Sequence, residues 1–212
     1  MDRSTFTELV KPFTLTSTER IHCLYDSLEH IRKNEVTGDC VECGVFKGGN
    51  ILGIMEYLDS HNIIDKKVWL YDTFTGMTVP EQVDRDYRDN VASEIFDSVD
   101  CIESLNQVKK NLSSSSFPAE KVNYVVGDVC ETLHDTKNLP ETISLLRLDT
   151  DWYASTKMEL EVLWHRLERN GVLIIDDYGH WKGCKKAVDE FFDGKSSEFV
   201  KVDYTAIYLI KT

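Results

Sequence analysis

The stretch Gly38–Gly49, GDCVECGVFKGG, decides the fold, and two interpretations compete for it. Cys40 and Cys43 have the C-x-x-C-G spacing of a zinc knuckle. Alternatively, the apolar run before Gly44 is a strand, and a turn containing Gly48 follows it and lets the backbone approach a nucleotide-like cofactor. The first interpretation predicts a metal-stapled interaction module, whereas the second predicts an enzyme.

The zinc interpretation lacks the ligands that it needs. A structural zinc site takes four ligands, usually from a second close pair. Residues three apart on a strand point to opposite faces, so Cys40 and Cys43 are poor co-ligands and are expected in the core. The remaining four cysteines stand alone in the sequence: Cys23, Cys101, Cys130 and Cys184. Glu42 is then a carboxylate inside an apolar strand, which indicates either a ligand contact or a structural ion pair.

Apolar runs and helical patterns alternate outward from this stretch. Strands of this kind, separated by helices, predict βαβ units in a doubly wound, mostly parallel α/β sheet. We expect seven strands, the last two forming a C-terminal antiparallel pair. The expected strands are 40–45, 67–72, 121–128, 143–149, 172–177, 199–204 and 206–211. The expected helices are 16–31, 50–60, 91–111, 155–171 and 181–194.

Composition excludes several classes of protein. A chain of 212 residues with 42% hydrophobic residues fits one globular domain with a sizeable core. The formal net charge of −13 argues against a nucleic-acid partner. The sequence has no run apolar enough for a membrane and no apolar signal core in residues 1–13. Together with six cysteines, this predicts a reduced, cytoplasmic protein. The sequence leaves open whether the chain forms a homo-oligomer.

Acidic residues follow the expected strands at the edge where open α/β sheets bind ligands. Asp72 ends the second strand and is a candidate to accept from ribose hydroxyls, with a turn cap as the alternative. Asp128 follows the third strand and is a candidate for an adenine amino group, with an Asx turn as the alternative.

The strongest candidate site combines Asp149 with Asp176 and Asp177, which follow two further apolar strands. If these strands are neighbours, three carboxylates converge, which is unfavourable unless a cation neutralises them. Oxygen ligands select a hard ion such as Mg²⁺, whereas the alternative role for these acids is to cap helices. Asp151 is positioned to act as a general base, and His180 is an alternative base.

Four segments occur in an order that resembles the macrocin O-methyltransferase family. They are VECGVFKGGN (41–50), YDTFTGM (71–77), LLRLDTDWYAST (145–156) and GVLIIDDYGHWKGCKKAVDEFF (171–192). Members of this family use S-adenosylmethionine and Mg²⁺ to methylate hydroxyls, typically of deoxysugars in natural products. The resemblance therefore implies a class I, Rossmann-like methyltransferase fold and an O-methyltransferase that acts on a sugar hydroxyl of a small-molecule acceptor.

The resemblance also implies roles for individual residues. Glu42, Gly44 and the glycine turn would hold the methionine part of the cofactor, Asp72 the ribose and Asp128 the adenine amino group. Asp151 would be the general base. The cofactor-binding set is Glu42, Gly44, Gly48, Asp72, Phe74 and Asp128. The ligands to Mg²⁺ would be Asp149, Asp176 and Asp177.

Two departures from the family pattern lie near the acceptor side. Thr150 replaces a usual glycine, and Trp152 replaces a methionine or similar residue. We expect residues 1–37 to be a helical extension and residues 75–116 to be a lid over the acceptor. The alternatives are an O-methyltransferase of the same fold acting on a catechol or phenol, and a non-catalytic S-adenosylmethionine-binding protein.

Overall fold

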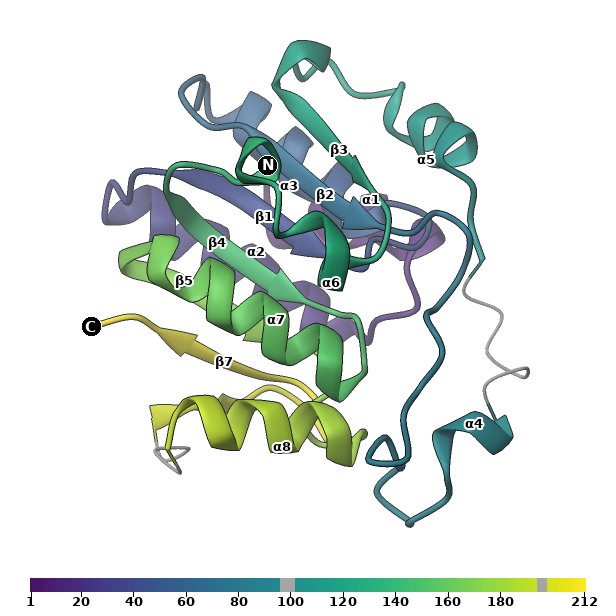
Figure 1. Ribbon diagram of the computed structural model, residues 1–212. Coiled ribbons are helices and arrows are strands. Elements are labelled where there is room, and N and C mark those ends of the chain that lie inside the picture. Colours follow the sequence, from purple (N-terminus) through teal and green to yellow (C-terminus); the bar gives the residue numbers. More distant parts are fainter. Residues whose placement is uncertain (96–101, 194–197) are drawn as a thin grey trace.

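A seven-stranded sheet runs through the middle of the computed structural model, which describes residues 1–95, 102–193 and 198–212 (Figure 1). The strand order is β3-β2-β1-β4-β5-β7-β6. The first five strands along the chain pair in parallel, and β7 lies antiparallel to both β5 and β6. The predicted fold class is therefore confirmed. The strands are β1 Asp39–Cys43, β2 Val68–Asp72, β3 Val122–Val126, β4 Ile143–Leu148, β5 Leu167–Ile175, β6 Val200–Lys201 and β7 Ile207–Ile210.

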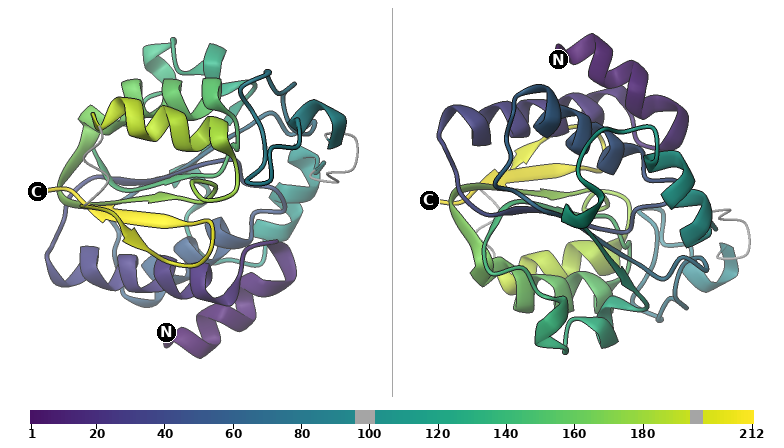
Figure 2. Two further views of the ribbon diagram at one scale, coloured as in Figure 1. Left: turned by 90° about the horizontal axis from the view of Figure 1, so that it is seen from below. Right: turned by 90° about the horizontal axis from the view of Figure 1, so that it is seen from above.

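Helices cover both faces of the sheet and give three layers (Figure 2). The first face carries α1 Arg3–Val10, α2 Thr18–Lys33, α3 Gly49–Ser60 and α5 Leu105–Leu112. The second face carries α6 Val129–Thr132, α7 Tyr153–Leu163 and α8 Lys182–Phe191. Because β2 and β4 flank β1 on opposite sides, the chain changes direction across the sheet beside β1, which is where such folds bind ligands.

The two cysteines of the opening stretch lie on opposite faces, as predicted. Cys40 packs in the apolar cluster under α1, α2 and α3, whereas Cys43 packs in the cluster under α7 and α8. Both side chains are fully buried. They are core residues of β1 and do not share a ligand.

The single helix predicted over residues 91–111 is wrong. The described part of this region contains two separate helices, α4 Ala92–Ile95 and α5 Leu105–Leu112. Ser104 caps the second of them, because its side chain accepts a hydrogen bond from the backbone N–H of Gln107. The helical pattern of residues 91–111 therefore belongs to two helices. Residues 96–101 of the predicted single helix lie outside the described residues.

The helix predicted to continue to Gly171 is also too long. Helix α7 ends at Leu163, and a short 3-10 turn leads directly into β5, which contains Gly171. Strand pairing explains why the helix ends early. Leu167 lies opposite Ile143 of β4 and begins the parallel pairing of β5 with β4. Tertiary pairing therefore overrides the helical pattern of this segment.

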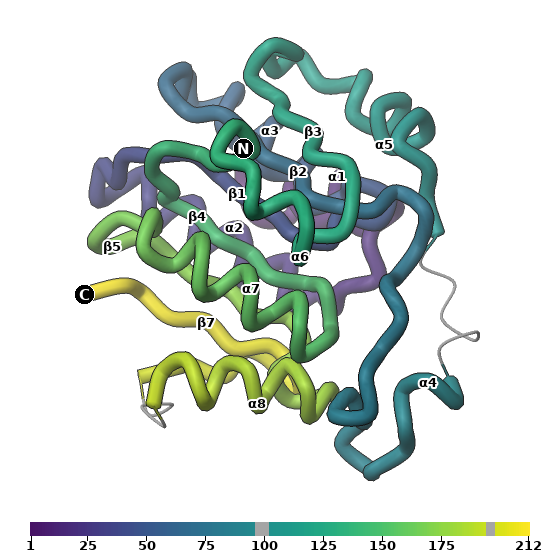
Figure 3. Tube along the Cα trace, in the orientation of Figure 1, coloured from purple at the N-terminus to yellow at the C-terminus, as the bar shows by residue number. Residues whose placement is uncertain are grey.

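The segment that follows β2 crosses to the start of α8 (Figure 3). Asp86 forms an isolated β-bridge with Trp181, and the backbone N–H of Lys182 donates to the Arg85 carbonyl over 2.8 Å. This segment is part of the region 75–116 expected to be a lid, and its middle is fixed to the second helical face. Among the described residues, no helix has the length and apolar character that crossing a membrane requires.

Candidate functional site

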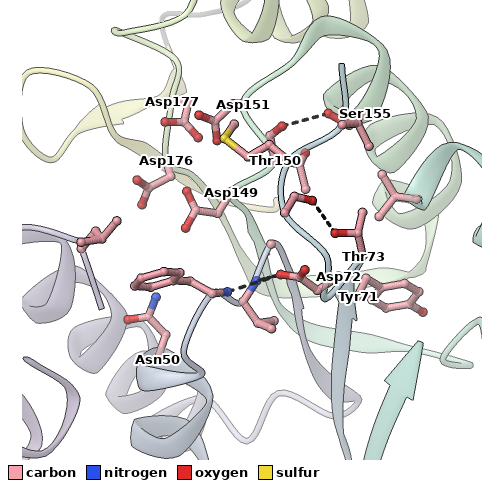
Figure 4. Close-up of a pocket in the computed structure, with 18 of the residues that line it drawn as sticks. Asn50, Tyr71, Asp72, Thr73, Asp149, Thr150, Asp151, Ser155, Asp176 and Asp177 are labelled. Carbon is pink, nitrogen blue, oxygen red and sulfur yellow. Dashed lines mark hydrogen bonds between the residues drawn. The ribbon is translucent and has the colours of Figure 1, made fainter. Parts of the chain in front are cut away.

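A cavity of about 300 Å³ opens at the carboxyl ends of the central strands (Figure 4). Its wall includes the turn after β1, the ends of β2 and β3, and the acidic loops after β4 and β5. Of the sequence-predicted residues, seven line the cavity: Gly44, Asp72, Asp128, Asp149, Asp151, Asp176 and Asp177. Glu42, Gly48, Phe74 and the alternative base His180 are not part of its wall.

The turn after β1 needs glycine where it passes the loop after β4. Gly44 has φ +78°, and a Cβ atom there would overlap the carbonyl oxygen of Asp149. The backbone N–H of Asp149 donates to the Cys43 carbonyl over 2.9 Å, so the two loops are joined directly. Gly48 also has a positive φ, +82°, and caps α3. Glycine therefore permits the close approach of two backbones at the mouth of the site.

Asp72 organises the same turn through backbone hydrogen bonds. Its Oδ2 accepts from the N–H groups of Val45 and Phe46 at 2.7 and 3.3 Å, and its Oδ1 accepts from Phe74 at 2.8 Å. Burial raises its pKa, against the effect of these hydrogen bonds. Phe74 is itself buried and has φ +54°. Asp72 is thus a turn cap that still faces the cavity.

Asp128 and Asn50 contribute polar groups to the cavity from two other elements. Asp128 caps α6 by accepting from the Cys130 N–H over 2.8 Å, which is the predicted Asx alternative. Asn50 lies in the first turn of α3 and lines the cavity. Its side chain donates to Glu42 Oε1 over 2.9 Å, so it connects the buried glutamate to the wall. Sequence reasoning missed Asn50.

Glu42 forms a structural ion pair, which was the alternative interpretation of its buried position. Its Oε1 accepts from Arg147 over 2.6 Å, while Oε2 has no hydrogen-bond partner among the described residues. Only 1% of Glu42 is exposed, and burial raises its pKa to about 7 although Arg147 opposes the shift. The carboxylate is held behind the cavity wall.

Arg147 joins the acids of three neighbouring strands, and sequence reasoning missed it. Its guanidinium pairs with Glu42 in β1, with Asp149 after β4 at 2.7 Å, and with Asp176 after β5. The side chain is 3% exposed. An arginine inside the apolar run ISLLRLD was the available signal, because a buried charge requires partners.

A second arginine connects distant parts of the chain to the same acids. Arg20 of α2 pairs with Asp176 and, at 3.0 Å, with Asp203 before β7. Asp203 also accepts from the Ser17 hydroxyl over 2.9 Å, and the Thr205 hydroxyl donates to the Asp176 carbonyl over 2.9 Å. Asp176 is therefore enclosed by partners from α2, β4 and the β6–β7 turn.

Three carboxylates converge beside Asp176, and of these Asp149 also pairs with Arg147. Asp149, Asp151 and Asp177 offer oxygens that all lie within 4.8 Å of one another (Figure 4). Burial and the neighbouring Asp149 raise the pKa of Asp151 to about 8, and burial with the same charges raises the pKa of Asp177. Asp151 has φ +68° and accepts from Trp181 Nε1 over 2.8 Å. We call these three residues the acid cluster, and their carboxylate oxygens are donors of the kind that suit a divalent cation.

A buried glutamate supports the loop that carries the cluster. Glu159 of α7 is fully buried, and its Oε1 accepts from the Thr150 hydroxyl over 2.9 Å. Its Oε2 has no hydrogen-bond partner that the described residues supply. Burial raises the pKa of Glu159 to about 8, against the effect of Thr150. The threonine that departs from the family pattern therefore has a specific partner.

Comparison with known proteins identifies the family. The model of the macrocin-O-methyltransferase (TylF) family matches residues 9–211. The chain is 30% identical to the demethyldecarbamoylnovobiocin O-methyltransferase of Streptomyces niveus, across 94% of this chain and 76% of that protein. It is also 30% identical to the mycinamicin III 3''-O-methyltransferase of Micromonospora griseorubida, across 92% of this chain and 77% of that protein.

Solved structures agree. The O-methyltransferase NovP superposes with a TM-score of 0.80 and 28% identity, covering 94% of this chain and 82% of that one. The calicheamicin methyltransferase CalS11 shares the fold, with a TM-score of 0.68 and 20% identity over 98% of this chain and 90% of that one. Family and fold together support S-adenosylmethionine as the methyl donor. The chain therefore belongs to the macrocin O-methyltransferase family and is an O-methyltransferase.

Proposed function

We propose that the protein methylates a hydroxyl of a sugar in a natural product and needs Mg²⁺ to do so. The relatives support the acceptor class, since a third, from Streptomyces olivaceus, is 30% identical over 92% of this chain and 74% of that protein and acts on a rhamnosyl tetracenomycin. The observation that carries the proposal is the acid cluster, because it shares one cavity with the glycine turn and Asp72.

The cofactor would lie along the first half of the cavity. Gly44 would allow close backbone approach, Asp72 would accept from the ribose hydroxyls, and Asp128 would accept from the adenine amino group, since all three line the cavity. Glu42, Gly48 and Phe74 would position this half of the site without lining the cavity. Asn50 lines the cavity and donates a hydrogen bond to Glu42, so it connects Glu42 to the cofactor half.

The cation would be held by Asp149, Asp176 and Asp177. Asp149 and Asp177 belong to the acid cluster, and Oδ2 of Asp149 accepts from Arg147, whereas both oxygens of Asp176 accept hydrogen bonds from arginines. The geometry therefore favours Asp149 and Asp177 as the direct ligands of the cation. Bound there, Mg²⁺ would act as a Lewis acid that lowers the pKa of an acceptor hydroxyl.

Asp151 would remove the proton from the acceptor hydroxyl. Its carboxylate lies in the cluster, and Trp181 Nε1 fixes its orientation through the hydrogen bond to Oδ2. The left-handed backbone of Asp151 turns this side chain toward Asp149 and Asp177. His180 is a weaker candidate for the base, because its Nδ1 lies 3.2 Å from the Tyr204 hydroxyl and its ring is outside the cavity wall.

Five cysteines among the described residues are free thiols: Cys23, Cys40, Cys43, Cys130 and Cys184. Free thiols fit a reducing compartment, so the proposal includes a cytoplasmic location.

The proposal is tested by calorimetry and an acceptor screen. We expect S-adenosylmethionine to bind the purified protein, and labelled methyl to be transferred to rhamnosides with Mg²⁺ present. Chelation with EDTA should abolish transfer, and added Mg²⁺ should restore it. A direct titration with Mn²⁺, followed by electron paramagnetic resonance, reads the cation site without activity. Transfer that persists in EDTA contradicts the cation role, and transfer to catechols but not to sugars contradicts the acceptor class.

A further inference from the structure

Four aromatic rings lie together next to the loops that carry the acid cluster. Tyr87 comes from the segment after β2, His180 and Trp181 from the β5–α8 connection, and Tyr204 from the β6–β7 turn. The His180 ring lies 5.5 Å from Tyr87, 4.7 Å from Trp181 and 5.9 Å from Tyr204, measured between centroids. We name these four residues the aromatic rim.

The rim is attached to the acid cluster by hydrogen bonds. Trp181 Nε1 donates to Asp151 over 2.8 Å, and the backbone N–H of His180 donates to the Asp177 carbonyl over 3.0 Å. Burial raises the pKa of the Tyr204 phenol, and Asp177 is among the charges that act on it. Two of the four rim residues are therefore held against the cluster, and Tyr87 and Tyr204 contact His180 in turn.

Two of the rings remain open to solvent. Tyr87 is 50% exposed and Tyr204 is 60% exposed, and their centroids are 6.5 Å apart. The guanidinium of Arg88 lies 5.0 Å from the Tyr87 ring and helps to hold it. Large aromatic side chains usually bury most of their surface, so an exposed pair beside a reaction centre is suited to a ligand that covers it.

We propose that the aromatic rim binds an aromatic ring carried by the acceptor beyond the sugar that is methylated. This inference rests on the proposed function. The rim residues do not line the cavity, which on the proposed function would hold the cofactor and the reacting sugar. The part of the acceptor that reaches the rim is therefore the aglycone. Aromatic pairs gain stability beyond the area that they bury, which gives selectivity for a flat ring.

The test compares the binding of two rhamnosides, 4-nitrophenyl and methyl, to the protein saturated with S-adenosylhomocysteine and Mg²⁺. Calorimetry should show the aryl rhamnoside binding roughly 10-fold more tightly. The double variant Tyr87→Ala/Tyr204→Ala should lose this preference and still bind S-adenosylhomocysteine. The matched control is Ile64→Ala, which removes a 76% exposed side chain before β2, away from the cavity, and should keep the preference.

Several results would overturn the inference. They are equal affinities for the two rhamnosides in the wild-type chain, no binding of the aryl rhamnoside, or a preference that survives the double variant. A cyclohexyl rhamnoside that binds as tightly as the aryl one would also overturn it, because the rim would then select apolar and not aromatic groups. If both rhamnosides are methylated and the aryl one is not preferred, the inference about the rim is wrong and the proposed function still stands. If a rim-dependent aryl preference exists without methyl transfer to sugars, the proposed function fails instead.

Discussion

The two halves of the cavity contain carboxylates in opposite situations. At the end of β2, Asp72 accepts three backbone hydrogen bonds and thereby shapes the turn around it. At the ends of β4 and β5, Asp149, Asp151 and Asp177 face one another. In the first half the carboxylate is satisfied by N–H groups of the chain itself, whereas in the second half Arg147 pairs with Asp149 and the pKa values of Asp151 and Asp177 are raised. On the proposed function, a bound cation would complete the second half.

Arg147 is the link between these halves, so its loss should have the largest effect. Arg147→Met leaves Glu42, Asp149 and Asp176 without their shared buried cation, and removing one partner of a buried pair costs about 3–5 kcal/mol. Urea denaturation at neutral pH should show this loss. The exposed Arg169→Met in the same sheet is the control, with a loss under about 0.5 kcal/mol. A loss under about 1 kcal/mol for Arg147→Met would show that the acids do not depend on it.

The next comparison replaces one carboxylate from each half. Asp177→Asn removes a charge from the acid cluster, so we expect Mg²⁺-dependent methyl transfer to fall by roughly 100-fold or more while S-adenosylmethionine affinity changes little. Asp72→Asn should do the reverse and mainly weaken cofactor binding. Calorimetry and initial rates separate the two effects.

Asp176→Asn sharpens this comparison, because Asp176 pairs with two arginines and lies outside the converging set. It should affect stability more than Mn²⁺ affinity. If Asp177→Asn keeps wild-type activity, or if it weakens cofactor binding as strongly as transfer, the division into two halves is incorrect.

The last prediction concerns Glu159, the buried carboxyl group that hydrogen-bonds Thr150 in the loop between Asp149 and Asp151. Burial raises the pKa of Glu159 to about 8, so the folded state holds a proton that the unfolded state releases near pH 4.3. Wild-type stability should then decrease, relative to Glu159→Gln, as the pH rises from about 4.3 to 8. The stability advantage of the glutamine variant should grow with pH over this range and be largest near pH 8.

Thermal unfolding at several pH values measures this difference. Glu161→Gln is a suitable control, because Glu161 lies in the same helix with an exposed side chain. An unchanged difference between wild type and Glu159→Gln across this range would show that Glu159 titrates normally.

Much of the architecture was predictable because the relevant signals are local. Apolar runs identified the five parallel strands, and the acids after four of them marked the ligand-binding edge. The cysteine spacing on β1 predicted a core role for Cys40 and Cys43. The end of α7 was not predictable in this way, since residues after Leu163 fit both a helical pattern and a strand until β4 is available for pairing.

The interior of the site depended on which strands are neighbours. The role of Arg147 follows from the order β1-β4-β5, which brings three acids to one guanidinium. Asp176 and Asp177 lie next to each other in the bend that follows β5, yet their surroundings differ. Asp176 pairs with Arg147 and Arg20, whereas Asp177 belongs to the acid cluster.

The ion pairs around Asp176 couple ligand binding in the cavity to the docking of segments near both ends of the chain. Through Arg20 and Asp203, residues separated by most of the sequence are fixed to the same carboxylate that flanks the cluster. By thermodynamic linkage, a ligand bound in the cavity stabilises only the state in which these distant segments are docked. Proteolytic cleavage near α2 and near the β6–β7 turn should therefore slow together when cofactor is added, since neither segment can detach without disturbing Asp176.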